Sequence, residues 1–338
     1  MEPKERLTRT FAGKTIDRPP VLCPGGMMAV SARGIMARAG FSGRDAHCDP
    51  EKMAAIAERI AGISGFENVG VPFCMTVEAE SFGARVDLGD IEREPAVTRY
   101  PCASLADFAR LSPAEPEKHG RLPVLLEALR LLKKSNPHLP IMGNLVGPIS
   151  LATSLVEPTT FFRAMRREAG TVHEILAFIT DFLVRLGRAQ FAAGADLITV
   201  ADPTSTGEIL GPMFFKEFAK PYLERLCRGL EQGGRPVIVH ICGNARLIAP
   251  AISDINPLAA FSFDSLVNVA RLKEQMGSLV LMGNVSTAVL EKGSPELVRK
   301  IARICLARGV EILAPACGIS PATPLANIRA LTGAVAGT

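Results

Sequence analysis

The chain has 338 residues, of which 48% are hydrophobic, and a formal net charge of +4. This length and hydrophobic content provide a sizeable core, within the range of one large α/β barrel. The positive charges are spread along the chain, which argues against binding to nucleic acid or to an anionic membrane surface. The charged N-terminus leads into no apolar signal segment, so we expect a cytoplasmic protein that does not cross a membrane. Eight cysteines in a chain of this length do not form a disulfide scaffold, and most are expected to be packing thiols.

The N-terminal third of the chain mixes helical patterns with short apolar runs. Residues 1–18 have the spacing of a short amphipathic helix followed by a turn. Residues 19–26 are predicted to form a first strand that ends in a glycine loop, and residues 68–73 a second strand. Residues 83–116, with several aspartates and prolines, are expected to be a small insertion of short strands and loop.

After this insertion, apolar strand-like runs alternate with longer helical stretches. The later predicted strands are 140–146, 196–202, 236–242, 259–264, 278–284 and 310–317. The predicted helices beyond the N-terminal one are 50–63, 121–135, 169–193, 211–233 and 294–308. With the first two strands this makes eight, and no glycine-rich dinucleotide fingerprint follows the first strand. We therefore predict an α/β fold: a single (β/α)8 TIM-type barrel, one domain over residues 1–338, with an N-terminal helical extension and a small insertion after the second strand.

The run Val237-Ile-Val-His240-Ile-Cys242-Gly243 combines a buried-strand pattern with two metal-binding side chains. Successive side chains of a strand alternate between faces, so His240 and Cys242 point the same way and can bind one ion. A later apolar strand ends in Cys317, and Asp264 ends the strand that follows His240. Alone, a histidine or cysteine in an apolar strand is usually a packed core residue. Together, one imidazole and two thiols at strand ends favour zinc, with Asp264 as a possible oxygen ligand.

Other polar residues at predicted strand ends would converge on the same mouth, because barrel enzymes build their sites at the C-terminal ends of the strands. Asp202 either lines this mouth or caps the following helix. Asn144 and Asn284 could hydrogen-bond a substrate, although asparagine is also common at strand and turn ends. Glu80, after the second strand, either faces the pocket or is solvated in a loop. These four are the candidate substrate-binding residues, whereas the histidines other than His240, His47 among them, are expected at the surface.

At these residues the chain resembles the uroporphyrinogen decarboxylase superfamily, and within it the methylcobamide:coenzyme M methyltransferase branch. The motifs that carry the resemblance span nearly the whole chain: Asp17-Arg-Pro-Pro20, Gly194-Ala-Asp196, Ala201-Asp202-Pro203, His240-Ile-Cys242-Gly243, Gly283-Asn284 and Leu313-Ala-Pro-Ala-Cys317-Gly-Ile-Ser-Pro321. The resemblance implies a (β/α)8 barrel whose catalytic zinc is bound by His240, Cys242 and Cys317. The acidic fourth ligand of the family falls on Asp264, where an aspartate replaces the usual, longer glutamate.

By the same resemblance, the expected reaction moves a methyl group from a methylated corrinoid to a zinc-activated thiol such as coenzyme M. A separate corrinoid protein would present the cofactor transiently, and glycines at Gly25, Gly26 and Gly243 would let it approach closely, although tight turns also explain them. Tetrahydrofolate as the acceptor is an open alternative, as is a structural zinc in a non-catalytic module that binds the corrinoid protein. Uroporphyrinogen decarboxylation ranks below methyl transfer. The arginine-rich segment of decarboxylases is replaced here by Cys23-Pro-Gly-Gly-Met-Met28, and residues 72–76 hold no clear counterpart of their catalytic aspartate.

Overall fold

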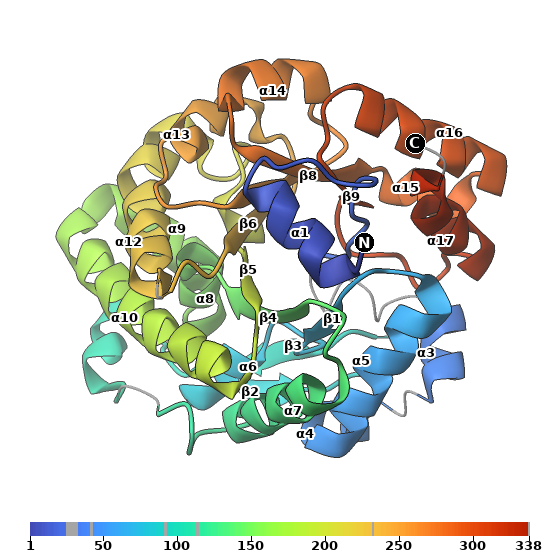
Figure 1. The fold of residues 1–338 in the computed structure, drawn as a ribbon. Helices are drawn as coiled ribbons and strands as arrows, with labels where there is room; N and C mark the ends of the chain where they lie inside the picture. The colour runs from blue at the N-terminus through green and yellow to red at the C-terminus, as the bar shows by residue number, and fades with distance from the viewer. Residues whose placement is uncertain (25–32, 41–42, 91–92, 113–114, 232, 337–338) are drawn as a thin grey trace.

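A parallel, curled sheet ringed by helices forms the body of the protein (Figure 1). This computed structural model describes residues 1–24, 33–40, 43–90, 93–112, 115–231 and 233–336. The sheet has seven strands in the order β1 (Val69–Val71), β4 (Ile141–Val146), β5 (Leu197–Ala201), β6 (Val237–Ile241), β7 (Ala260–Phe263), β8 (Val280–Val285) and β9 (Ile312–Pro315). Each neighbouring pair is parallel, as crossover connections through helices require. The predicted fold class is confirmed.

The eighth position of the barrel is filled by an extended segment rather than a full strand. Val21 forms an isolated parallel bridge with Leu313 of β9, and the amide of Glu67, just before β1, donates to the Val21 carbonyl at 2.9 Å. The preceding residues, Pro19 and Pro20, have no N–H group and cannot donate to a strand ladder. The first predicted strand is therefore reduced to one bridge, which still connects β9 with β1.

The helices surround the barrel on its outside, except for the N-terminal one (Figure 1). Within the described residues the α-helices are α1 (Pro3–Phe11), α3 (Arg33–Ala39), α4 (Arg44–Cys48), α5 (Pro50–Ser64), α6 (Val77–Ser81), α7 (Leu122–Ser135), α8 (Pro148–Leu155), α9 (Pro158–Arg167), α10 (Ala169–Ala193), α11 (Gly211–Phe214), α12 (Lys220–Leu230), α13 (Ala249–Ser253), α14 (Val269–Met276), α15 (Thr287–Lys292), α16 (Pro295–Ala307) and α17 (Leu325–Thr332). Local sequence sets their ends. In α5, for example, the Asp49 carboxylate accepts the amides of Glu51 and Lys52, and Gly65 ends the helix in the left-handed region at φ 84°.

Two of the sequence predictions for helical regions need correction. The predicted helix over 211–233 is interrupted, because a π-helical turn at Phe215–Ala219 separates α11 from α12. His47, expected at the surface, is 1% exposed in α4. The neighbouring Cys48 is exposed, unlike the packing thiols Cys23, Cys74, Cys102, Cys227 and Cys305, which are all buried as predicted.

A small two-stranded unit follows β1 and α6, within the range 83–116 for which an insertion was predicted. It contains an antiparallel pair, β2 (Arg85–Asp87) and β3 (Ala96–Arg99), followed by a 3-10 helix at Leu105–Arg110. The predicted glycine loop at Gly25 and Gly26 lies outside the described residues. Within the described ranges, no helix is both long enough and apolar enough to cross a bilayer.

The inside of the barrel has an apolar floor beneath a polar layer. The floor joins Leu7 of α1, which lies across the N-terminal end of the barrel (Figure 1), to inward-facing strand residues. Its other members are Leu22, Met142, Leu197, Ile238, Ala260, Val280, Met282, Ile312 and Ala314. The polar layer consists of Asn144, Thr199, His240, Ser262 and Asn284, all of which are buried. Each follows a floor residue by two positions, so the period of the strands places these polar side chains inside the barrel, towards its C-terminal end.

Candidate metal centre

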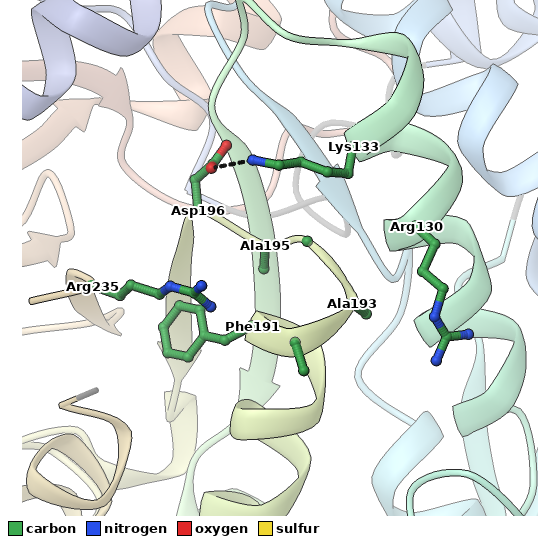
Figure 2. Close-up of a pocket in the computed structure, with 9 residues that line it drawn as sticks. Arg130, Lys133, Phe191, Ala193, Ala195, Asp196 and Arg235 are labelled. Carbon is green, nitrogen blue, oxygen red and sulfur yellow. Dashed lines mark hydrogen bonds and ion pairs between the residues drawn. The ribbon is translucent and has the colours of Figure 1, made fainter. Parts of the chain in front are cut away.

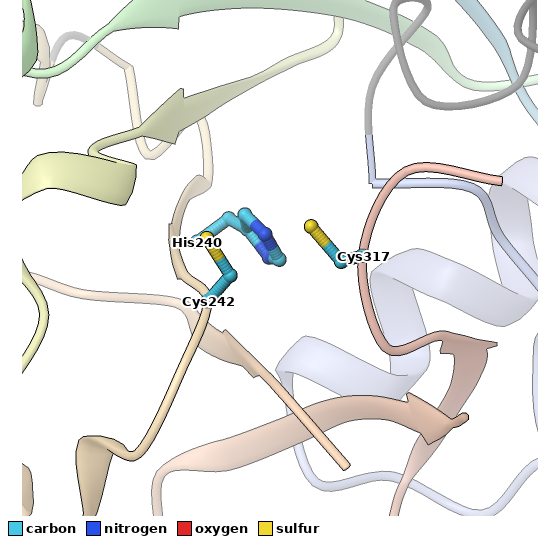
Figure 3. A group of neighbouring side chains, drawn as sticks. All are labelled: His240, Cys242 and Cys317. Atoms are coloured by element: carbon cyan, nitrogen blue, oxygen red, sulfur yellow. The ribbon is translucent and has the colours of Figure 1, made fainter. Parts of the chain in front are cut away.

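One imidazole and two thiols meet at the C-terminal end of the barrel. His240 lies in β6, Cys242 directly follows that strand, and Cys317 follows β9 by two residues. Their ligand atoms all lie within 4.8 Å of one another, although the two cysteines are 75 positions apart in the chain. Figure 3 shows the three side chains turned towards a common point from the two strands. The geometry predicted from the alternation of His240 and Cys242 is therefore present, together with the distant cysteine.

The His240 ring is oriented by a neighbour that the sequence reasoning did not identify. Its Nδ1 lies 2.9 Å from the Ser262 hydroxyl, on the residue paired with His240 in the β6–β7 register. Its Nε2 is buried and has no hydrogen-bond partner among the described residues. A buried ring nitrogen is normally paired, so an atom left open beside two thiols fits a metal ligand. Imidazole nitrogen and thiolate sulfur are the donors that zinc prefers.

The two thiols influence each other's ionisation. Hydrogen bonding from Cys242, assisted by the nearby His240, lowers the pKa of Cys317 to about 4. The same contact with Cys317, together with burial, raises the pKa of Cys242. This is the behaviour of two close sulfurs that share one proton, because a second negative charge is opposed by the first. A bound divalent cation would remove this opposition and allow both groups to be thiolates.

Asp264, the candidate fourth ligand, lies outside this group of ligand atoms. One of its carboxylate oxygens accepts the backbone N–H of Gly243 at 3.2 Å, and the other accepts from Ser265 and Leu266 at 3.1 Å. Both oxygens thus bind the loops that follow β6 and β7. The grouped donor set is three side chains, which is the number found in catalytic zinc sites with one open position.

Two of the four candidate substrate-binding residues hold strands and loops together near the centre. Asn284 donates to the backbone carbonyls of Asp264 and Val267, both at 3.2 Å. Asp202 is 0% exposed and accepts from the Ser150 amide at 2.8 Å and from the Ser150 hydroxyl at 2.6 Å, at the start of α8. Burial raises its pKa. Asp202 thus caps a helix that precedes it in the chain, whereas the sequence left open whether it lines the mouth or caps the helix that follows.

Of the other two candidates, Asn144 lies within β4 and Glu80 within α6. Asn144 donates to the Val71 carbonyl at 2.9 Å, and its side-chain oxygen is buried with no partner among the described residues. Glu80 forms an ion pair with Arg121 at 2.6 Å, in which the arginine side chain is 7% exposed. Their contact with a substrate stays a prediction.

Arg121 belongs to a buried polar cluster that sequence patterns did not reveal. Besides Glu80, its guanidinium contacts the Cys74 sulfur at 3.4 Å and the Thr76 hydroxyl at 3.0 Å.

Glu78, beside this cluster, is 2% exposed and accepts the Val146 amide at 2.9 Å. Burial raises the pKa of Glu78 to about 7. Burial, together with the charge of Arg121, lowers the pKa of His47 to about 4, so that ring is neutral at physiological pH.

A separate surface pocket of about 430 Å³ is lined in part by residues that precede β5 and β6 (Figure 2). Its lining includes Lys133, paired with Asp196 at 3.1 Å, and Arg235, which lies over the Phe191 ring at 5.1 Å from its centroid. Asp196 directly precedes β5 and Arg235 precedes β6. Barrel enzymes place their chemistry at the C-terminal ends of the strands, so this pocket is not the candidate active site.

Comparison with known proteins gives a consistent assignment over almost the full length. The chain is 33% identical over 329 residues to the methylcobamide:CoM methyltransferase MtbA of Methanosarcina acetivorans, covering 97% of this chain and 95% of the relative. It is 31% identical over 337 residues to the methylcobamide:CoM methyltransferase MtaA of Methanosarcina barkeri, covering 98% and 96%. A solved structure of a methyltransferase from Methanosarcina mazei matches with a TM-score of 0.92 at 30% identity, covering 99% of this chain and 98% of that chain. The family model for uroporphyrinogen decarboxylase (URO-D) matches residues 2–337, and the chain therefore belongs to this family.

Proposed function

We propose that this protein is a zinc-dependent methyltransferase that moves a methyl group from a methylated corrinoid to a thiol such as coenzyme M. The observation that carries the proposal is the convergence of His240, Cys242 and Cys317 at the barrel mouth, with the buried Nε2 of His240 left open. The relatives named above are methylcobamide:CoM methyltransferases and align over nearly the whole chain. We also propose a cytoplasmic location, since a reducing compartment keeps both ligand thiols available.

The residues of the centre have distinct parts in this reaction. His240, Cys242 and Cys317 would hold zinc, which when bound supplies a positive charge that stabilises the incoming thiol as a thiolate. The acceptor sulfur then forms a bond to the methyl carbon, and the cobalt–carbon bond breaks with its electron pair remaining on cobalt. The apolar floor beneath His240 excludes water from below, and Asp264 fixes the loop that carries Cys242 through its bond to Gly243. With Asp264 bonded in this way, His240, Cys242 and Cys317 would hold the ion and leave it able to bind the acceptor sulfur.

Exposed apolar side chains around the mouth support the proposal that the corrinoid is carried by a partner protein. Large apolar side chains are exposed on the segments that follow β5, β6 and β7: Ile209 is 52% exposed, Met213 69%, Leu247 53% and Leu266 66%. A hydrogen bond connects the first two of these segments, in which the Glu208 carboxylate accepts the Asn244 amide at 2.9 Å. Large apolar groups exposed on segments that follow neighbouring strands are consistent with a surface that meets another protein. We propose that a corrinoid protein binds transiently at this rim, defined as Ile209, Met213, Leu247 and Leu266.

A methyl-transfer assay tests the proposed function. Purified protein is incubated with methylcobalamin and a panel of acceptors that includes coenzyme M, other small thiols and tetrahydrofolate, and zinc content is measured in parallel. We expect demethylation with a thiol acceptor, loss of the reaction after chelation and recovery on adding zinc. Activity with tetrahydrofolate and with no thiol would replace the proposed acceptor. Full activity of the metal-free protein would overturn the role of the centre, and zinc binding without any transfer would favour the non-catalytic module.

A further inference from the structure

A buried serine hydroxyl contacts the ring of the histidine in the candidate centre. Ser262 of β7 is 0% exposed and is the register partner of His240 on β6. Its Oγ lies 2.9 Å from Nδ1, on the side of the ring away from the unpaired Nε2. Both side chains belong to the polar layer, directly above Ala260 and Ile238 of the apolar floor. The strand pairing therefore presents this hydroxyl to the ring from a rigid, buried element.

The proton on Nδ1 decides whether Nε2 can bind a metal. A neutral imidazole carries one N–H, so a proton on Nδ1 leaves the Nε2 lone pair available, and a proton on Nε2 removes it. In the first state Nδ1–H donates to the Ser262 oxygen. In the second state the serine hydroxyl donates to Nδ1, and the buried Nε2–H faces the two sulfurs. Only the first arrangement supplies a ligand.

We propose that Ser262 is a positioning residue that accepts the Nδ1–H of His240 and so fixes the ring and its tautomer for metal binding through Nε2. This inference rests on the proposed zinc centre. A hydroxyl differs here from the carboxylate often found behind metal-binding histidines, because it orients the ring without adding a negative charge. With two thiolates already present, a neutral partner keeps the centre able to accept a third sulfur anion.

Zinc affinity of matched variants tests the proposal without relying on activity. Chelator competition is performed on the wild type, Ser262→Ala, Ser262→Thr and Thr199→Val, with thermal unfolding of each metal-free protein as a check on folding. Thr199 is the control, since it lies in the same polar layer but its hydroxyl contacts the Met142 sulfur at 3.1 Å. We expect Ser262→Ala to weaken zinc binding about 10–100-fold, Ser262→Thr to restore most of it and Thr199→Val to change it less than about 2-fold. Wild-type affinity of a folded Ser262→Ala protein, or an equal loss in Thr199→Val, would overturn the proposal.

A measurement on the unmodified protein covers the case in which Ser262→Ala does not fold. Long-range 1H–15N NMR of the zinc-loaded wild type is expected to show a protonated Nδ1 and a metal-bound Nε2 for His240. A proton on Nε2 in the zinc-loaded protein would refute the tautomer assignment. A wild type that binds no zinc at all would instead refute the proposed function, so the two failures are distinguishable.

Discussion

Replacing Cys317 by alanine should separate metal binding from folding. Cys317 lies beyond β9 and is partly exposed, so removing its sulfur should change the stability of the metal-free protein by only about 1 kcal/mol. The same substitution should weaken zinc binding much more strongly. Four-ligand zinc sites have apparent binding free energies of about 10–16 kcal/mol, so one ligand contributes about 3 kcal/mol, or about 100-fold in affinity. Methyl transfer should fall with the zinc content.

The assay compares wild type, Cys317→Ala and Cys48→Ala, where Cys48 is an exposed cysteine outside the grouped ligands. Zinc content is measured after gel filtration, and thermal unfolding is recorded with and without zinc. Zinc at about a thousand times its Kd should stabilise the wild type and Cys48→Ala by about 4 kcal/mol, and Cys317→Ala by much less. Stoichiometric zinc and a wild-type transfer rate in Cys317→Ala would refute the three-ligand centre. Unfolding of Cys317→Ala at room temperature would instead indicate a structural zinc.

Three other predictions follow from features away from the ligands. Leu266→Ser at the rim should slow methyl transfer from a corrinoid protein several-fold but should not slow transfer from free methylcobalamin. The control Leu297→Ser, which replaces another exposed leucine on α16, should change neither rate. An equal loss of rate with both donors in Leu266→Ser would argue against the docking surface. The pKa of Glu78 is raised to about 7, so the folded protein binds the Glu78 proton more tightly than the unfolded chain does. The free energy of unfolding should therefore fall by about 3 kcal/mol as the pH rises from 4.5 to 7. Glu78→Gln should remove this part of the pH dependence in denaturant titrations, and an unchanged profile would contradict the assignment. Leu7→Ala in the apolar floor should cost about 3 kcal/mol in the same titrations, and a loss below about 1 kcal/mol would show that α1 does not support the floor.

Most of the fold was predictable because its strands are buried on both faces. Their continuous apolar runs, separated by helical patterns, identified the barrel and nearly all of its strands. The first strand was overestimated, since Pro19 and Pro20 make an extended segment look like a strand without providing ladder donors. The burial of His47 was missed because α4 is short and its packing against the rest of the molecule leaves no periodic signal.

The site was predictable only where the ligands carry their own pattern. The spacing of His240 and Cys242 expresses the alternation of a strand, and Cys317 shares their position at a strand end. Ser262 and Arg121 have no such signal, because their partners come from other strands and helices and are defined by tertiary contacts. The carboxylate of Asp264 illustrates the same limit, since its bonds to Gly243 and Leu266 depend on how two loops meet.

The filled lower half of the barrel would impose an order on the reactants of the proposed methyl transfer. With α1 and its neighbours closing that side, a small acceptor must travel inward past the rim to reach the sulfurs and the imidazole. A carrier protein seated on the rim would cover this passage. In the proposed reaction the acceptor would therefore have to enter first and the carrier second, and the methylated product would depart only after the carrier had left. Saturating amounts of carrier should then slow turnover by trapping enzyme whose passage is covered before it is loaded.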